Sequence, residues 1–281
     1  MHNIKNIRNN LDEFKSKIQS RNMDINIEEI VSLDKENRTL IQKKENLEKE
    51  KKDISKSKDK SLFEKSKEIS IELDSLAKEQ SLIKNKLDKI LSSIPNIPMP
   101  DVPIGKDETF NKEINKFGSI PKFDFNARSH YEIGEKLNML DFNLATKTTG
   151  SRFVFVKDKL AALERAISNF MIDVHTQTNG YKEISPPLMA SDDSMYGTGQ
   201  LPKFENDQFE VKLDEKNDRK FLIPTAEVIL TNMARDQILN IKDLPMRLVA
   251  ATPCFRKEAG SYGKDTKGMI RQHQFYKVEL V

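Results

Sequence analysis

The stretch FRKEAGSYGKDTKGMIRQHQF, residues 255–275, places charged side chains on both sides of a glycine-rich connection. From Gly263 to Gly268 its spacing matches a phosphate-binding G-x-x-x-x-G loop, but Met269 and Ile270 stand where that loop needs Lys and Ser or Thr. A phosphate-binding loop also opens a helix, whereas this connection leads into an alternating, strand-like segment. The sequence therefore argues against a P-loop.

The alternation continues in QHQFYKVELV, residues 272–281. Successive side chains of a strand point to opposite faces, which predicts one face made of Arg271, His273, Phe275, Lys277 and Glu279. An aromatic ring among cations and a carboxylate is a poor core and a good binding floor. The ring can stack on a base, worth about 1–3 kcal/mol, an arginine can clamp a phosphate, and a glutamate can receive an ammonium group. A solvated, salt-bridged face is the alternative. The strand that ends at 255–258 is the expected hairpin partner.

The first 94 residues contain no Gly and no Pro, which predicts helix throughout. Two apolar series repeat every seven residues and are separated by a polar stretch at 56–61. We predict an antiparallel pair of long helices that bury each other's apolar stripe, with the turn near 56–62. The series are Leu33, Leu40, Leu47 and Ile54, then Ile69, Leu76, Ile83 and Ile90.

The tip of this helical arm is basic, because residues 43–60 hold eight lysines against five acids. A basic tip on a long arm suits contact with a phosphate backbone. A solvated coiled coil used for oligomerisation is the alternative, and the arm by itself does not decide between them.

The composition changes after the arm. Four prolines within IPNIPMPDVPIG, residues 94–105, exclude regular helix and predict a linker or an extended entry into a second domain. Residues 156–178 have helical periodicity and end at Gly180. A long helix followed by strands and hairpins predicts an antiparallel α+β domain. The expected strands lie around 208–213, 220–223, 246–256 and 270–281.

Composition limits the classes of protein that fit. Lys and Arg number 47 against 44 Asp and Glu in 281 residues, so net charge does not point to nucleic acid. A single cysteine, Cys254, excludes an internal disulfide and is expected to serve as a small buried apolar group. The N-terminus lacks an apolar leader and no apolar run approaches about 20 residues, which predicts a soluble cytoplasmic protein. The four histidines show no ligand spacing, so no structural or catalytic zinc is predicted.

The segment FRKEAGSYGKDTKGMIRQHQFYKVE resembles motif 2 of the class II seryl-tRNA synthetases. The resemblance covers the whole chain, and the N-terminal helical hairpin stands where that family carries its tRNA-binding arm. Further matching segments are NIPMPDVPIG at 96–105, HYEIGEKLNMLDF at 130–142, YKEISPPL at 181–188, GTGQLPKF at 197–204 and LIPTAEVILTN at 222–232.

The resemblance implies roles for particular residues. Arg256 would be the catalytic contact to the α-phosphate of ATP, Glu258 would hold the adenine end, and Phe275 would stack on the adenine. Lys257 would join the ATP site, and Arg271 would be a further phosphate contact. The serine pocket would be formed by Thr225, Ala226, Glu227 and Glu279.

The resemblance also implies a reaction and partners. Serine would be activated by ATP, with Mg²⁺ bridging the phosphates, and then passed to the 3′ end of tRNA(Ser), with tRNA(Sec) as a conceivable second acceptor. Residues 1–100 would form the arm and 101–281 an incomplete catalytic domain. Residues 156–188 resemble motif 1, which implies a homodimer; a buried core helix has a comparable periodicity.

The chain departs from the family at Val281, where an alternating pattern stops without a turn signal and before any motif 3. We therefore expect a piece of a longer protein, inactive by itself. Two other functions stay open at this point. One is a synthetase-like paralogue that activates an amino acid for another carrier, which the long arm disfavours. The other is a structural coiled-coil protein, which is disfavoured by the strand face and by the loop Thr225–Ala226–Glu227.

Overall fold

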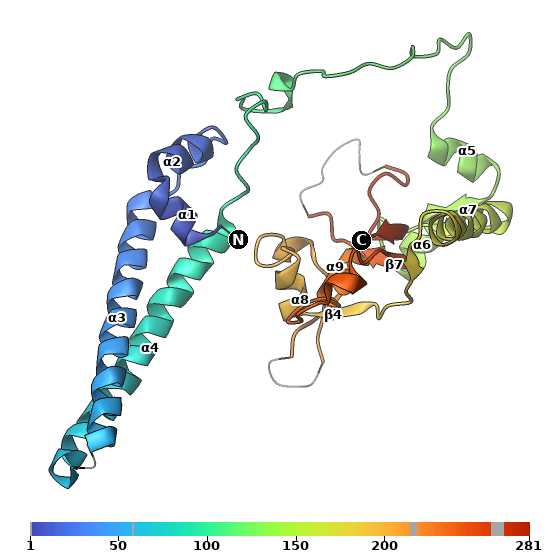
Figure 1. The fold of residues 1–281 in the computed structure, drawn as a ribbon. Coiled ribbons are helices and arrows are strands. Elements are labelled where there is room, and N and C mark those ends of the chain that lie inside the picture. The colour runs from blue at the N-terminus through green and yellow to red at the C-terminus, as the bar shows by residue number, and fades with distance from the viewer. Residues whose placement is uncertain (1, 58, 214–217, 260–266) are drawn as a thin grey trace. The chain divides into compact units, whose positions relative to one another are not determined.

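The computed structural model describes residues 2–57, 59–213, 218–259 and 267–281 (Figure 1). The chain divides into two compact units, Met1–Ser119 and Ile120–Val281. Much of the connection predicted at 259–269, including Gly263, lies outside the described residues, as does residue 58 in the predicted turn of the arm.

The first unit is built on two long helices of the predicted kind, α3 (Ile27–Ser57) and α4 (Phe63–Ser93). They run antiparallel along their length (Figure 1), and a 3-10 helix at Lys60–Leu62 precedes α4. Leu40 and Leu76, one from each heptad series, are buried at 5% and 9% exposure. Leu47 and Ile54, nearer the tip, are only half-buried. On α4 the order is reversed, since Ile69 near the tip is buried at 5% exposure whereas Ile83 and Ile90 are half-buried, so burial of the seam does not fall off toward the tip.

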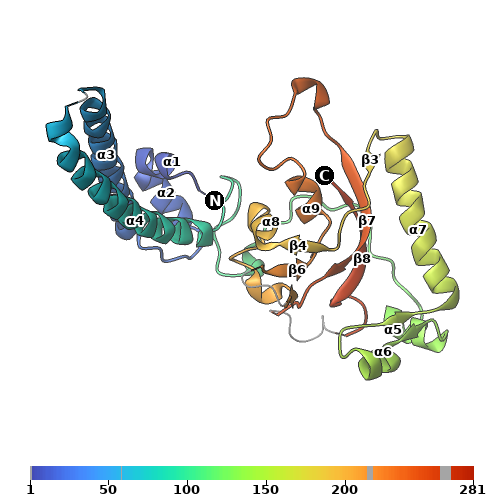
Figure 2. The same cartoon turned by 90° about the horizontal axis from the view of Figure 1, so that it is seen from below.

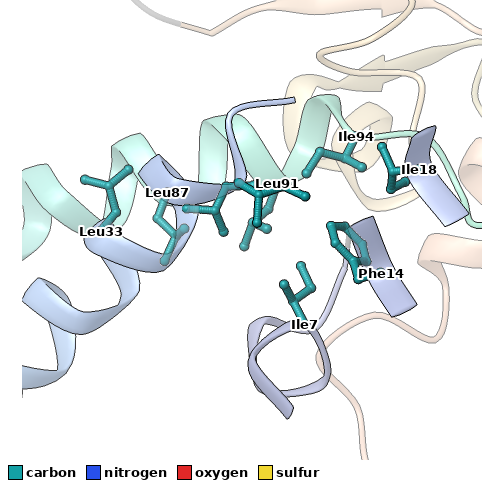
Figure 3. Close-up of a cluster of buried hydrophobic side chains, with 9 residues drawn as sticks. Ile7, Phe14, Ile18, Leu33, Leu87, Leu91 and Ile94 are labelled. Carbon is teal, nitrogen blue, oxygen red and sulfur yellow. The ribbon is translucent and has the colours of Figure 1, made fainter. Parts of the chain in front are cut away.

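The base of the arm carries two short helices that the sequence analysis did not separate, α1 (Ile4–Asn9) and α2 (Leu11–Gln19). Figure 3 shows how Ile7, Phe14 and Ile18 of these helices lie against side chains of α3 and α4. An ion pair secures the same contact, because Arg8 donates two hydrogen bonds, of 2.8 and 2.9 Å, to the buried carboxylate of Asp34 on α3. The base is thus a small four-helix core in its own right.

Residues 94–129 follow the arm and, apart from a 3-10 helix at Glu108–Phe110, have no helix or strand. This agrees with the extended segment predicted from the prolines at 94–105. Helix α4 ends at Ser93, immediately before that segment.

The second unit has the predicted α+β character (Figure 2). Its main sheet has the order β3-β7-β8; β7 and β8 pair antiparallel, whereas the short β3 pairs parallel with β7, an exception to the predicted antiparallel pattern. Helix α7 (Asp158–Gln177) packs against β7 and β8. The strands are β3 (Lys182–Glu183), β7 (Leu248–Phe255) and β8 (Gln274–Leu280).

A second sheet, of order β4-β6-β5, and a two-stranded sheet, β1-β2, complete the unit. All three pairs in these sheets are antiparallel. The strands are β1 (Leu140–Asp141), β2 (Phe155–Val156), β4 (Met189–Ser191), β5 (Glu210–Val211) and β6 (Lys220–Leu222). The helices are α5 (His130–Lys136), α6 (Phe142–Thr148), α8 (Asp192–Gly197) and α9 (Glu227–Asn232), with 3-10 helices at Glu205–Asp207 and Ile241–Asp243.

Strand β8 begins four residues later than predicted, at Gln274 instead of 270. The sequence alternates from Arg271 onward, but the side chains point to opposite faces of a strand only from Gln274. Cys254 on β7 is fully buried, as predicted, and burial raises the pKa of its thiol.

Candidate functional site

The site is built where β7 ends and β8 begins. Phe255, the last residue of β7, donates its N–H to the carbonyl of Ile223 at 2.9 Å, which draws the segment after β6 alongside β7. Ala226 and Leu230 then bury themselves against Leu248 and Ala250 of β7. These contacts fix Thr225 and the start of α9 next to the charged residues that follow β7.

Within β8 the predicted alternation holds. Phe275, Lys277 and Glu279 are half-buried, whereas Gln274, Tyr276 and Leu280 on the opposite face are exposed. The register pairs Cys254 with Phe275, Thr252 with Lys277 and Ala250 with Glu279. Small or medium side chains on β7 therefore leave room beside the three charged and aromatic side chains of β8.

At one end of this face the Glu279 carboxylate lies in a closed hydrogen-bond network. The Thr225 hydroxyl, in a residue only 4% exposed, donates to Glu279 Oε2 at 2.5 Å and accepts from Lys277 Nζ at 3.1 Å. Lys277 also forms an ion pair with Glu279. The carboxylate can thus hold an ammonium group here, and in this structure Lys277 supplies it.

At the other end lie Arg256, Phe275 and the Glu258–Arg271 pair. The Arg256 guanidinium stands over the Phe275 ring, 5.2 Å from its centre, and its Nε donates to the Pro224 carbonyl at 3.3 Å. Arg271 Nη1 donates to Glu258 Oε2 at 2.8 Å. Two guanidinium groups, a ring and a carboxylate are the groups that a nucleoside phosphate requires.

A pocket of about 310 Å³ opens beside these groups. Thr225 is the link between the two ends, because it lines this pocket and also contacts Glu279. The lining residues are Gln200, Phe204, Asp207, Gln208, Pro224, Thr225, Arg256, Glu258 and Arg271.

Not every predicted residue lines the pocket: Phe275 and Glu279 lie behind it, in contact with the lining residues Arg256 and Thr225 respectively. Lys257 is exposed and places its ammonium over the Phe209 ring, 5.7 Å from the ring centre. Glu227 is exposed at the start of α9, with its backbone N–H directed to the Thr225 hydroxyl at 3.3 Å. Ala226 is buried, and its neighbours hold the loop in place.

His273, which the alternation placed on the site face, is not among the residues that line the pocket. It lies immediately before β8, and its ring packs edge-on against Phe153 and Phe209, with ring centres 5.3 and 5.6 Å away. Burial lowers the pKa of His273 below its usual range, and the charge of Arg152 acts in the same direction. This histidine therefore lies among aromatic rings, outside the set of pocket-lining residues.

Several lining residues were missed by the sequence analysis. Gln200 and Phe204 come from the loop after α8, and Asp207 and Gln208 from the segment that follows. Asp207 receives the N–H groups of Lys257, on its carbonyl, and of Ala259, on its carboxylate, both at 2.8 Å. Gln208 is 4% exposed, and its Oε1 has no hydrogen-bond partner among the described residues. No periodic pattern singles out such loop residues; the GTGQLPKF segment was the one available signal.

Comparison of the sequence with known proteins shows to which family the chain belongs. Residues 1–98 match the seryl-tRNA synthetase N-terminal domain, and residues 208–281 match the tRNA synthetase class II core domain (G, H, P, S and T). A serine–tRNA ligase of Pelagibacter ubique (strain HTCC1062) is 71% identical over all of this chain, which covers 67% of that relative. The chain belongs to the seryl-tRNA synthetase family.

Other members of the seryl-tRNA synthetase family agree in sequence and in structure. A serine–tRNA ligase of Syntrophotalea carbinolica is 46% identical, again over 100% of this chain and 67% of the relative. The crystal structure of seryl-tRNA synthetase from Pyrococcus horikoshii complexed with ATP superposes with a TM-score of 0.83 at 32% identity, covering 100% of this chain and 69% of that one. The chain spans about two thirds of the length of these relatives.

Family membership confirms the resemblance found in the sequence, and with it an ATP-dependent aminoacyl-tRNA ligase with a helical arm and a class II sheet domain. A purely structural coiled-coil protein is thereby excluded. Among the described residues, none of the helices combines the length and the apolar character needed to cross a membrane.

Proposed function

We propose that the protein of which this chain is part activates L-serine with ATP to seryl-adenylate, releasing pyrophosphate, and then transfers serine to the 3′ end of tRNA(Ser). The observation that carries this proposal is the continuity of the site: Thr225 lines the pocket beside Arg256 and also bonds to Glu279. The nucleotide end and the ammonium-binding end of the site therefore both adjoin Thr225. The carboxylate of the substrate serine would meet the α-phosphate of ATP at this point.

At the nucleotide end, Arg256 neutralises the α-phosphate as the serine carboxylate attacks it, and Phe275 stacks on the adenine. Glu258 and Arg271 line the same pocket, for the adenine end and a further phosphate respectively. Arg256 already lies over the Phe275 ring, so base and guanidinium would share the two faces of one ring. Lys257 is assigned to the ATP site as well, and its position over Phe209 puts any contact outside the pocket lining.

At the serine end, Glu279 receives the substrate ammonium in place of Lys277, and the Thr225–Ala226–Glu227 segment forms the surrounding wall. The Thr225 hydroxyl is buried and already serves as both donor and acceptor. A pocket that hydrogen-bonds the serine hydroxyl rejects alanine, because the groups that bond this hydroxyl would be left unpaired.

Magnesium is assigned to the phosphates of bound ATP. The described parts of the chain contain no group of three or more His, Cys, Asp or Glu side chains that could hold a metal ion. The acidic residues that line the pocket are Asp207 and Glu258. When bound, the ion supplies charge neutralisation at the phosphates.

Residues 1–100 are assigned to tRNA binding and residues 101–281 to the catalytic domain, whereas the division into compact units falls after Ser119. Support comes from the match of residues 1–98 to the family's N-terminal domain and from the lysines at 43–60. A tRNA(Sec) acceptor is included in the proposal because it would be read by the same arm. The cytoplasm is the proposed compartment, since Cys254 is the one cysteine and tRNA charging takes place there.

A homodimer through residues 156–188 is also proposed. Of the residues of α7 only Ile172 is buried, whereas Leu163 and Phe170 are 53% and 67% exposed. A core helix would bury such residues, so this apolar face fits a contact with a second copy.

The test is amino-acid-dependent ATP–pyrophosphate exchange by the full-length protein, run against a panel that contains serine, alanine, threonine and cysteine. Exchange that depends on serine alone supports the proposal. Exchange that depends on another amino acid, or on none, would refute the assignment of the pocket. Serine-dependent exchange without transfer to any tRNA would instead favour the paralogue that loads another carrier.

A further inference from the structure

Both limbs of the connection between β7 and β8 contact one separate part of the chain. We call that part the α5–β2 segment; it runs from His130 to Val156 and comprises α5, β1, α6 and β2. The limb after β7 carries Glu258 and the limb before β8 carries Arg271, so the segment contacts both stretches of chain that supply the pocket's ion pair.

The limb before β8 is held by α5. The N–H of Met269 donates to His130 Nε2 at 2.8 Å, and the Lys267 ammonium lies over the Tyr131 ring, 5.1 Å from its centre. Gly268 sits between these contacts at φ +76°, and a Cβ there would come within 2.4 Å of His130 Nε2. The approach of α5 to this limb is therefore close enough to require glycine.

The limb after β7 is held by Arg152, in the loop between α6 and β2. Its Nη1 donates to the Glu258 carbonyl at 2.8 Å. Its own carbonyl accepts the His273 N–H at 2.9 Å, so Arg152 also contacts the limb before β8. Arg152 and Glu258 both have left-handed backbones, with φ of 63° and 50°. Residues other than glycine keep this conformation only where their surroundings hold it.

We infer that His130 and Arg152 are positioning residues for ATP binding, acting through the two limbs to set the Glu258–Arg271 pair against the pocket. Neither side chain is among those that line the pocket. This inference rests on the proposed nucleotide role of that pocket. It predicts a defect confined to ATP, because the serine end is held by the β7–β8 pairing and by α9 instead.

The experiment compares His130→Phe with His130→Gln in the full-length protein. Phenylalanine keeps a flat ring and removes the acceptor for Met269, whereas glutamine keeps an acceptor at similar reach. In serine-dependent pyrophosphate exchange, His130→Phe should raise the KM for ATP about fivefold, the effect of one lost hydrogen bond, and leave the KM for serine unchanged. His130→Gln should recover most of the loss. A lower kcat with both KM values unchanged, or equal effects on both substrates, would overturn the inference.

A second pair of variants tests the close approach itself. Gly268→Ala should raise the KM for ATP, and the increase should be smaller in a His130→Ala background, where the clash at Nε2 is gone. Equal increases in the two backgrounds would mean that His130 does not hold this limb.

A readout that needs no activity separates this inference from the proposed function. Hydrogen exchange of the Met269 amide should be slow in the unsubstituted protein and in His130→Gln, and fast in His130→Phe. Protection that survives His130→Phe refutes the hold of His130 on Met269, whether or not the protein exchanges pyrophosphate. Absent exchange in the unsubstituted protein, with the predicted protection pattern intact, refutes only the proposed function.

Discussion

At the scale of the residue, the account depends on one strand that serves two ligands. Phe275 and Glu279 lie four residues apart on the same face of β8, roughly 13 Å at the rise of a strand. The first contacts Arg256 and the second contacts Thr225, so the two ends of the site can be perturbed separately.

Phe275→Ala should weaken ATP binding by about 1–3 kcal/mol, the energy of stacking a base on an aromatic ring, with little change in serine binding. Arg256 loses the ring beneath its guanidinium in the same variant, which acts on the same ligand. Calorimetric titration with each substrate measures the effect. Tyr276→Ala is the matched control, since this aromatic residue is 60% exposed on the opposite face. Equal losses of ATP affinity in Phe275→Ala and Tyr276→Ala would show that the effect does not come from the site face.

Glu279→Ala should do the reverse: serine affinity falls because its ammonium loses the carboxylate, while ATP affinity changes little. The same titrations report it. The variant also leaves Lys277 without its carboxylate partner, so Lys277→Met is the companion that shows how much of the change comes from that lysine. If Glu279→Ala harmed both ligands equally, the assignment of ends would have to be abandoned.

Parity predicted the face of Phe275, Lys277 and Glu279, because alternation is a local property of strands. It did not predict the contacts of His273, which lies just before the strand and packs against Phe153 and Phe209, because those contacts join residues far apart in the chain. The bond between Lys277 and Thr225 joins residues 52 positions apart, and no local pattern encodes it.

At the scale of the element, the arm can be separated from the site by deletion. The base core uses Ile30 and Leu33 on α3 and Leu87 and Leu91 on α4, all outside residues 36–85. Removing 36–85 therefore takes away the basic tip and the outer seam and keeps the base packed around α1 and α2.

A deletion of residues 36–85, closed by a short flexible link, should abolish tRNA charging and leave serine-dependent pyrophosphate exchange largely intact. The physical reason is that the deletion removes the lysines at 43–60 and none of the residues that line the pocket. Both activities are measured on one preparation of the deletion variant, which otherwise keeps the full-length protein. Charging that survives the deletion would show that the arm does not bind tRNA.

The heptad series predicted α3 and α4 well, since burial of a seven-residue stripe fixes both period and pairing. The break that separates α1 and α2 from α3 could not be predicted in the same way. It lies near Asn22, which takes a left-handed backbone at φ 55° although residues 1–94 contain neither Gly nor Pro.

At the scale of the whole molecule, the exposed apolar face of α7 predicts that the full-length protein is a dimer. Analytical ultracentrifugation should show a stable dimer, and a charge placed by Phe170→Glu should shift it toward monomer, because that side chain is 67% exposed in the isolated chain. Lys159→Glu on the same helix is the control for added charge alone. A stable, active monomer of the unsubstituted protein would overturn the dimer.

The central claim is that a site which joins ATP to serine works together with an arm that reads tRNA. The most direct measurement is the charging of total tRNA with labelled serine by the full-length protein, in the presence of ATP and Mg²⁺. The account predicts that labelled serine becomes attached to tRNA(Ser) and that mild base releases it. The Arg256→Ala variant should attach no serine. Serine-dependent pyrophosphate exchange with no labelled tRNA at any protein concentration would contradict it.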